Sequence, residues 1–283
     1  LSLEQIKAIR AATTCELESF VHGALCVSYS GQCYLSCHLT GRSANRGSCI
    51  QACRSNYDLV DATGKVLLKE KPILSLKDFS LEQYIPQLVE AGISSFKIEG
   101  RLKNESYVRN VTRHYRNIID KLGYTKSSFG SIEGGFTPNI DQTFSRGYTT
   151  YFLTGERGQW NSGESAKAIG EEIGTITRIL TSGKMESRFT FEGKPLNNGD
   201  GLFIITPRGE KIGIRADKVE GQTVSVKQTK GIVSGSRIYR NFNQKFEKEI
   251  ESNPPKRVLQ AKVEITASPD GITARALCEN GTA

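Results

Sequence analysis

Four cysteines crowded into one polar stretch constrain the fold of this chain more than any other feature. Cys26, Cys33, Cys49 and Cys53 follow the spacing C-x6-C-x15-C-x3-C, and the residues between them are rich in Gly, Ser, Asn and Arg rather than in aliphatic side chains. This composition is typical of a loop. Thiols gathered in a loop hold a metal ion or an iron–sulfur cluster, form disulfides, or remain unligated.

The spacing favours an iron–sulfur cluster without excluding the alternatives. A cluster needs several thiolates that converge on one point, whereas structural zinc is usually held by two close pairs of ligands. Only Cys49 and Cys53 form a close pair, although His22 and His38 could serve as zinc ligands. A histidine bonded within its own strand or loop is the commoner case. Three glycines permit the loop to wrap, because glycine tolerates positive φ: Gly31, Gly41 and Gly47.

The cysteine count also bears on the compartment. The chain has seven cysteines, the others being Cys15, Cys37 and Cys278. An odd, locally clustered set is not the pattern of a secreted disulfide framework, so we expect a reducing, cytoplasmic setting. No run of about 18 apolar residues is present, and we expect no association with a membrane. The first residues contain no Met and the last follow half a hairpin, so we expect a fragment of a longer protein.

Length and charge set broader limits. A chain of 283 residues has room for two domains, and its 37% apolar content is enough for packed cores. The formal net charge of +8 favours a polyanionic partner such as RNA, although a basic surface that only faces solvent has the same charge.

The first part of the chain alternates between helical and strand patterns. Helices are predicted over residues 2–12, 80–90 and 106–121, with Ser2 and Ser80 as N-caps and Gln83 completing a capping box. Strands are predicted over 15–21 and 93–99, with two short strands around Leu59 and 66–68 that a turn at Gly64 separates. This alternation predicts the C-terminal part of a TIM-type (β/α) barrel over residues 1–123.

The second part has the pattern of an all-β protein. Residues 124–165 are polar and are predicted to be a linker with irregular structure. Six short strands separated by turn residues then predict a small β-barrel or sandwich domain over 166–243, namely 173–179, 187–191, 202–206, 213–216, 223–228 and 236–239. Residues 244–283 are predicted to be a charged helix or linker and the start of a further β unit.

Four ordered segments resemble a known family. They are residues 18–36, which include ESFVHGALC and YSGQCYLS, residues 42–54 (RSANRGSCIQACR), 91–101 (AGISSFKIEGR) and 144–149 (FSRGYT). These segments resemble peptidase family U32, the collagenase-like peptidases, over roughly residues 1–243. The last segment resembles the junction between the barrel and the β domain of longer members that modify ribosomal RNA.

The resemblance implies an iron–sulfur enzyme that hydroxylates a tRNA or rRNA base. Relatives with similar cysteines carry a 4Fe-4S cluster, and RNA-hydroxylating relatives are thought to take oxygen from prephenate, a small carboxylate. By resemblance Cys26, Cys33 and Cys49 are cluster ligands and Cys53 is the natural fourth. Two alternatives stay open: a collagenase-like peptidase, for which the sequence has no nucleophile elbow or zinc-protease motif, and a non-enzymatic RNA-binding or assembly module with structural cysteines.

A second candidate site follows the strand at 93–99. Active sites of (β/α) barrels lie at the carboxyl ends of the strands, and alternation places Lys97 and Glu99 on the same side. We expect these two to pair, with Arg101 available to bind a carboxylate or phosphate. A structural ion pair is the alternative. Basic residues also punctuate the helix at 106–121, and this face is predicted either to contact an RNA backbone or to face solvent.

Overall fold

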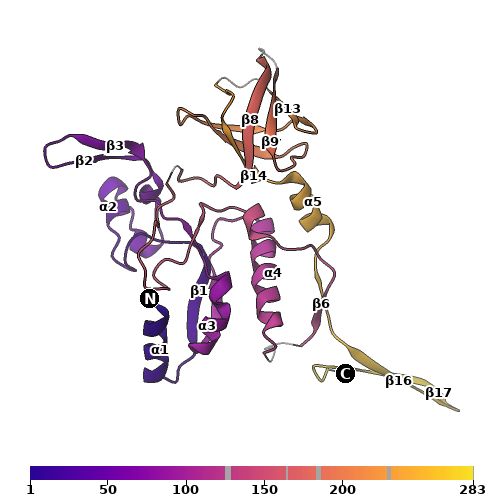
Figure 1. Cartoon of the computed structure of the whole chain (residues 1–283). Coiled ribbons are helices and arrows are strands. Elements are labelled where there is room, and N and C mark those ends of the chain that lie inside the picture. The colour runs from indigo at the N-terminus through magenta and orange to yellow at the C-terminus, as the bar shows by residue number, and fades with distance from the viewer. Residues whose placement is uncertain (125–128, 164, 183–185, 228–230, 283) are drawn as a thin grey trace.

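The computed structural model describes residues 1–124, 129–163, 165–182, 186–227 and 231–282. A mixed α/β region comes first and an antiparallel β region follows it (Figure 1). This order confirms the prediction of an α/β part followed by an all-β part.

A four-stranded mixed sheet organises the α/β region, with the strand order β5-β1-β4-β7. β1 and β5 are parallel, whereas β4 is antiparallel to β1 and parallel to β7. The β1–β5 and β4–β7 pairs are parallel, as all neighbouring strands of a TIM-type barrel are, but the antiparallel β1–β4 pair departs from that arrangement, so the barrel stays a prediction. The strands are β1 (Leu17–Ala24), β4 (Asp78–Ser80), β5 (Ile93–Ile98) and β7 (Tyr148–Thr149).

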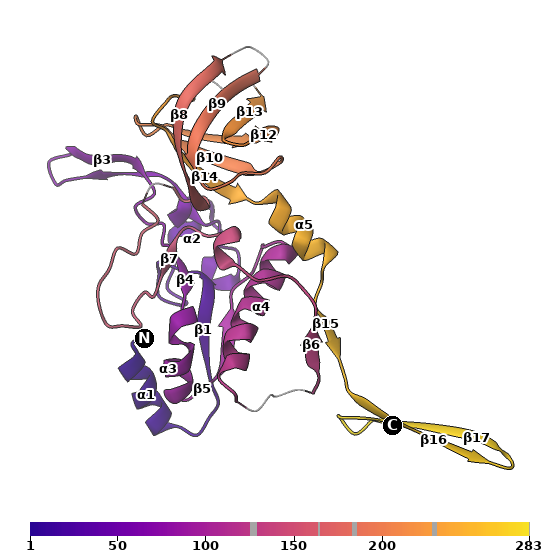
Figure 2. The same cartoon turned by 45° about the vertical axis from the view of Figure 1, so that its right-hand side comes forward.

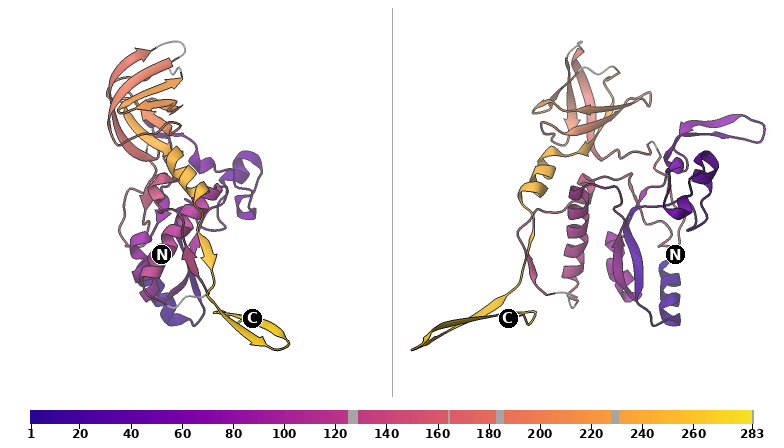
Figure 3. Two further views of the ribbon diagram at one scale, coloured as in Figure 1. Left: turned by 90° about the vertical axis from the view of Figure 1, so that its right-hand side faces the viewer. Right: turned by 180° about the vertical axis from the view of Figure 1, so that it is seen from behind.

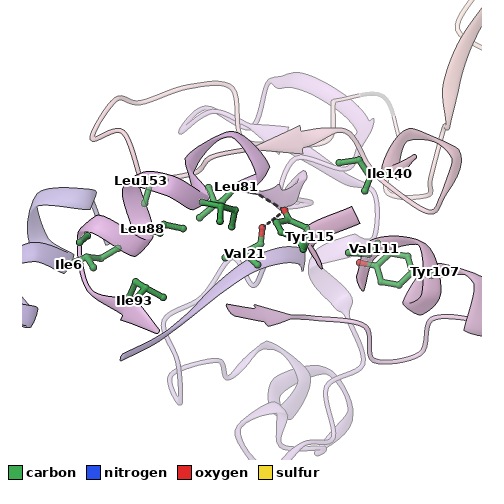
Figure 4. Close-up of a cluster of buried hydrophobic side chains, with 12 residues drawn as sticks. Ile6, Val21, Leu81, Leu88, Ile93, Tyr107, Val111, Tyr115, Ile140 and Leu153 are labelled. Carbon is green, nitrogen blue, oxygen red and sulfur yellow. Dashed lines mark hydrogen bonds between the residues drawn. The ribbon is translucent and has the colours of Figure 1, made fainter. Parts of the chain in front are cut away.

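Helices α1 (Leu3–Ala12), α3 (Ile85–Glu90) and α4 (Glu105–Lys121) share one hydrophobic core with this sheet (Figures 2 and 4). Ser2 caps α1 in a capping box with Gln5, which confirms the predicted start of that helix. The hydroxyl of Tyr115 donates to the Val21 carbonyl over 2.9 Å and so ties α4 to β1 (Figure 4). Core residues from all three helices and both parallel strands are buried: Ile6, Val21, Ile85, Leu88, Ile93, Val111 and Tyr115.

The predicted helix at 80–90 is wrong in its first half. Ser80 is the last residue of β4 and pairs with His22 instead of capping a helix. A 3₁₀ turn (Glu82–Tyr84) follows, and α3 begins at Ile85 with a proline in its first turn. The backbone of Ser80 is engaged in pairing with β1, so this residue ends a strand instead of beginning a helix. Pro86 is favoured only in the first turn of a helix, and α3 accordingly begins just before it.

The segment predicted as a linker contains secondary structure. Residues Ser131–Glu133 form β6 and Ile140–Gln142 form a 3₁₀ turn, while β7 lies in the FSRGYT segment. β7 pairs with β4, so this segment contributes a strand to the sheet of the α/β region. A hairpin of β2 (Tyr57–Val60) and β3 (Val66–Lys71) turns at Gly64, as predicted.

The β region is a seven-stranded antiparallel sheet that curls into a half-barrel (Figure 3). Its strand order is β11-β10-β14-β8-β9-β13-β12, and its core includes Phe189, Ile204 and Ile238. All six predicted strands are present and β12 is additional. The strands are β8 (Glu171–Ser182), β9 (Glu186–Gly193), β10 (Gly201–Ile205), β11 (Lys211–Arg215), β12 (Lys218–Glu220), β13 (Thr223–Lys227) and β14 (Arg237–Phe242).

The last segment runs back beside the α/β region. Helix α5 (Gln244–Ser252) follows β14, and β15 (Lys256–Val258) pairs with β6. A hairpin of β16 (Ala261–Ser268) and β17 (Gly271–Cys278) then projects outward (Figure 1). Within the described ranges, no helix has the length and apolar character needed to cross a membrane.

Candidate functional site

The cysteine segment is a loop that leaves the carboxyl end of β1. Cys26 lies two residues beyond that strand, and the loop then forms α2 (Leu35–Thr40) and two 3₁₀ turns, Ala44–Arg46 and Ala52–Arg54. Gly41 and Gly47 end α2 and the first turn with φ of 72° and 83°. This confirms the expectation that the glycines allow the loop to wrap.

Hydrogen bonds join the two halves of the loop. The Cys33 amide donates to Asn45 Oδ1 over 3.1 Å, and the Ile50 amide donates to Ser36 Oγ over 3.3 Å. Ser36 is only 2% exposed, so the second bond lies in the interior of the loop. The segment with Cys26 and Cys33 is therefore held against the segment with Cys49 and Cys53.

The four predicted ligand cysteines share one electrostatic neighbourhood. Burial raises the pKa of the Cys53 thiol, the charge of Arg54 opposes this, and the thiols of Cys26, Cys49 and Cys33 raise the Cys53 pKa further. All seven cysteines are free, and Cys26 and Cys49 are exposed. The loop thus brings these four thiols near one another, whereas Cys37 is exposed on α2 and Cys15 and Cys278 lie in other segments.

The donor set fits an iron–sulfur cluster in its chemistry. Within the described residues, no group of three or more His, Cys, Asp or Glu side chains is placed as a metal site requires. The thiols are therefore neighbours that do not converge at bonding distance. The Gln51 amide nevertheless donates to Cys49 Sγ over 3.3 Å, the kind of bond by which proteins tune cluster sulfurs. Four thiols and an amide donor are suitable partners for such a group.

Arg54 connects the cysteine loop with the sheet. Its Nη2 donates to the Leu25 carbonyl over 2.9 Å, next to Cys26, and its Nη1 donates to Ser75 Oγ over 2.9 Å and to the Leu76 carbonyl. Arg54 directly follows Cys53 in the sequence, where its charge is placed to neutralise a bound cluster or to bind an anion. The structure gives it a structural role as well, because its guanidinium fixes both ends of the loop.

The two histidines considered as zinc ligands, His22 and His38, occupy very different surroundings. His38 is exposed on α2, whereas His22 is 1% exposed. The His22 ring packs against Tyr107, Tyr115 and Tyr148, with Nδ1 3.3 Å from the Tyr115 hydroxyl. Burial and the charge of His114 lower the His22 pKa to about 4. His22 is thus a neutral core residue, and a bulge between Phe20 and His22 turns it towards the helices.

Lys97, Glu99 and Arg101 lie together at the end of β5, but the expected pairing is wrong. Lys97 Nζ contacts Glu18 Oε1 over 3.1 Å on the exposed face of the sheet. Glu99 Oε1 instead accepts from the Arg101 amide over 2.7 Å. Hydrogen bonds from Lys97 and Ser95 lower the pKa of Glu18. The partner of Lys97 comes from the neighbouring strand because β1 and β5 are in parallel register there.

A group of cations beside this end of the sheet was missed as a site. Arg146 forms a buried ion pair with Asp78, Nη1 to Oδ1 at 2.8 Å. Lys103 Nζ lies 3.3 Å from the centre of the Phe144 ring. Burial and the charges of Arg146 and Arg54 lower the pKa of Lys103, and the charges of Asp78 and Glu99 oppose this only in part. In the described part of the chain, Lys103 has no ion-pair partner. Its position two residues after the KIEGR motif was the available signal.

The basic face of α4 is largely engaged within the chain. Arg109 pairs with Glu105 at 2.5 Å, and Arg116 pairs with Asp120 at 2.7 Å. Arg113 Nη2 donates to the Gly134 carbonyl over 2.7 Å. The first two contacts lie within α4 and the third holds α4 to the segment at Gly134, so these contacts favour a structural role for this face rather than contact with RNA.

A thiol-rich loop at the carboxyl end of a strand, bordered by cations, defines an α/β protein whose function resides in its loops. The family model of peptidase family U32 matches residues 1–162, and the chain belongs to this family. The sequence-based recognition is therefore confirmed.

Curated relatives divide between RNA modification and proteolysis. The chain is 44% identical over 225 residues to the 23S rRNA 5-hydroxycytidine C2501 synthase of Escherichia coli, covering 78% of this chain and 34% of that protein. It is 34% identical to the tRNA hydroxylation protein P1 of Bacillus subtilis, covering 76% and 49%. It is 32% identical to a collagenase of Porphyromonas gingivalis, covering 78% and 61%.

The chain thus spans between a third and about three fifths of the length of these relatives. No solved structure matches it.

Proposed function

We propose that this chain is part of an iron–sulfur enzyme that hydroxylates a base of ribosomal or transfer RNA. The observation that carries the proposal is the gathering of Cys26, Cys33, Cys49 and Cys53 in one loop at the end of β1. The 44% identity to an rRNA hydroxycytidine synthase supports an RNA base as the substrate. Ribosomal RNA is the favoured target, because the identity to the tRNA hydroxylation protein is lower at 34%.

The sheet supports the proposed position of the site. One face of β1 and β5 packs against the helices, while the other exposes Phe20 and the Lys97–Glu18 pair. In a TIM-type barrel the helix-free face points into the barrel, and the strand carboxyl ends form the active site. We propose that these strands belong to such a barrel, with Lys97 facing its interior and the thiols at its mouth.

The four thiols are the proposed cluster ligands. When bound, a 4Fe-4S cluster would supply redox chemistry that protein side chains lack. Thiols must lose their protons to become ligands, and burial opposes this at Cys53 while the charge of Arg54 favours it. Arg54 would therefore assist ligation and also keep Cys26 and Cys53 on one side of the loop. Zinc remains the alternative occupant.

A small carboxylate co-substrate, with prephenate as the candidate, would suit the cations beside the sheet. Lys103 meets aromatic rings rather than a carboxylate, and Arg146 and Arg54 lower its pKa by proximity. A half-buried cation without a counterion is stabilised when an anion binds. We propose Lys103 and Arg101 as the residues that bind the carboxylate, while Glu99 orients the Arg101 backbone.

Nucleoside analysis tests this function. Deletion of the full-length gene should remove a nucleoside that is heavier than its parent by one oxygen atom, and the gene should restore it. A Lys103→Met gene should restore it poorly, whereas a Lys121→Met gene, altered at the far end of α4, should restore it fully. An unchanged nucleoside profile after deletion would contradict the proposal.

Because one of the relatives is a collagenase, a peptidase is the second candidate function. The imidazole of His22 bonds to Tyr115 and that of His114 to Glu82, so neither forms a dyad with a thiol. Cleavage of peptides by homogeneous full-length protein, persisting after chelation and lost with Cys26→Ser, would favour the peptidase.

A further inference from the structure

An aromatic cluster lies in the segment that follows β7. The rings of Tyr151, Phe152 and Trp160 pack together with centroids 4.1 to 4.9 Å apart. Phe152 is 42% exposed and the other two rings are half-buried. The cluster lies in the segment between β7 and β8, outside the β region.

The buried residue Leu153, which follows Phe152 in the chain, anchors the cluster to the hydrophobic core. Leu153 is 4% exposed in the core, and its carbonyl accepts from the Leu3 amide at the start of α1 over 3.0 Å. Tyr151 has a φ of 51°, which is uncommon for a residue with a bulky side chain. Such strained conformations concentrate at ligand sites. The turn thus buries Leu153 and keeps the adjacent rings at the surface.

Backbone contacts connect the cluster to the cysteine loop. The Lys77 amide donates to the Trp160 carbonyl over 2.7 Å, and Leu76 forms a β-bridge with Asn161. The Leu76 carbonyl in turn accepts from Arg54, whose other nitrogen binds the carbonyl preceding Cys26. Arg54 thus links the two features through its hydrogen bonds to the Leu76 and Leu25 carbonyls.

The electrostatics agree with this proximity. Burial raises the pKa of Tyr151, and Cys26 and Tyr29 raise it further. Tyr29 belongs to the cysteine loop and is 85% exposed.

We propose that the cluster of Tyr151, Phe152 and Trp160 is a stacking surface for an unpaired base of the RNA substrate, next to the thiol loop. Aromatic rings bind single-stranded RNA by stacking on the bases, whatever their sequence. The net charge of +8 supplies the complementary attraction for the backbone. The inference rests on the proposed RNA substrate and assigns residues that hold the strand while a neighbouring base is modified.

The chain contains one tryptophan, so its fluorescence reports on this cluster directly. Titration of the 283-residue chain with a short unstructured RNA should quench Trp160 emission in a saturable way. An abasic ribose-phosphate oligomer of equal length should bind more weakly and leave the emission unchanged. Binding of the RNA, detected by anisotropy of a labelled end, without a change in Trp160 emission would overturn the proposal.

Substitutions give a second readout. Stacking on an aromatic side chain contributes about 1–3 kcal/mol per base, so Phe152→Ala should weaken RNA affinity about 5- to 150-fold. Trp160→Phe should retain most of the affinity, because it keeps an aromatic face. Phe129→Ala removes a ring that is 59% exposed at the far end of α4 and should change nothing. Equal affinities for Phe152→Ala and the unaltered chain would overturn the stacking surface.

The two proposals fail differently. If the full-length gene with Phe152→Ala restores the hydroxylated nucleoside fully and its product binds RNA normally, the stacking surface is wrong and the enzyme function stands. If deletion of the gene leaves every nucleoside unchanged, the enzyme function is wrong, and any quenching of Trp160 by RNA then supports only a binding surface.

Discussion

The β region pairs the polar groups beside its sheet with one another, whereas the α/β region leaves a few of its polar groups without such partners. In the β region, Glu171 accepts from Lys194, Gln142 and Arg240, and Arg240 also contacts the buried Asp200. In the α/β region, Lys103 meets only aromatic rings in the described structure, and four thiols lie near one another without converging. Polar groups that satisfy one another stabilise a fold, whereas groups left without partners are suited to bind a ligand.

The polar network of the β region meets the α/β region at Gln142. Gln142 precedes β7 and donates to Glu171, and the amide of Asn243 in turn donates to Gln142 Oε1 over 2.7 Å. Trp160 lies on the α/β side of this junction. Its fluorescence therefore follows unfolding of the α/β region, while the far-ultraviolet circular dichroism includes the curled sheet.

Arg146→Met should have the largest effect on stability. It removes the partner of Asp78, which is 3% exposed. Loss of one member of a buried ion pair costs about 3–5 kcal/mol, because a charge stays buried alone. Urea unfolding followed by Trp160 emission should show this loss.

The matched control is Arg116→Met, which breaks a pair whose side chains are 41% and 36% exposed. Exposed pairs contribute about 1 kcal/mol or less. Similar unfolding midpoints for the two variants would refute the importance of the buried Asp78–Arg146 pair.

His22 should make the α/β region sensitive to mild acid. Its pKa is about 4 in the folded chain and 6.5 in an ordinary environment. The unfolded chain therefore takes up the proton first as the pH falls below 6.5, so stability declines down to about pH 4. The full loss is about 3 kcal/mol. His22→Gln should flatten the pH dependence of the Trp160 transition in this window, and an unaltered slope would contradict a buried neutral His22.

Glu171 should respond at lower pH and in the β region. Burial alone would raise its pKa, but hydrogen bonds from Lys194, Arg240 and Gln142 and the charge of Arg240 lower it to about 2. Stability from this group is complete above pH 4.5 and declines as the pH falls towards 2.

The loss at Glu171 is about 1–2 kcal/mol after allowance for solvent screening. Glu171→Gln should reduce the acid dependence of the circular-dichroism transition between pH 4.5 and 2, and should leave the His22 window unchanged. If Glu171→Gln changed the pH dependence of unfolding in both pH ranges, the stabilities of the two regions would not respond to acid independently.

Local sequence patterns were sufficient to predict most elements. The α1 capping box, the long helix α4 and the hairpin turn at Gly64 depend on residues a few positions apart, and all three are present. The helix predicted at Ser80 failed because that residue pairs with His22, which is 58 positions away. Strand pairing over such separations leaves no trace in local periodicity.

Some parts of the candidate site were likewise predictable from local sequence, and others were not. The loop cysteines were recognisable from spacing and from the family segments, since all four lie within one stretch. The partners Lys97–Glu18 and Arg146–Asp78 join residues far apart in the sequence, and they depend on parallel register and on the position of β7. The stacking cluster was missed because Tyr151 and Trp160 lie in a segment predicted to be an irregular linker.

The most direct test concerns the thiol loop itself. Full-length protein purified without oxygen should be brown, with about four iron and four sulfide per chain, as a 4Fe-4S cluster requires. Cys53→Ser should lose the colour and most of the iron. Cys37→Ser, altered at an exposed thiol of the same loop, should keep both. Colourless protein with stoichiometric zinc, or a Cys53→Ser variant with its full iron content, would contradict the account.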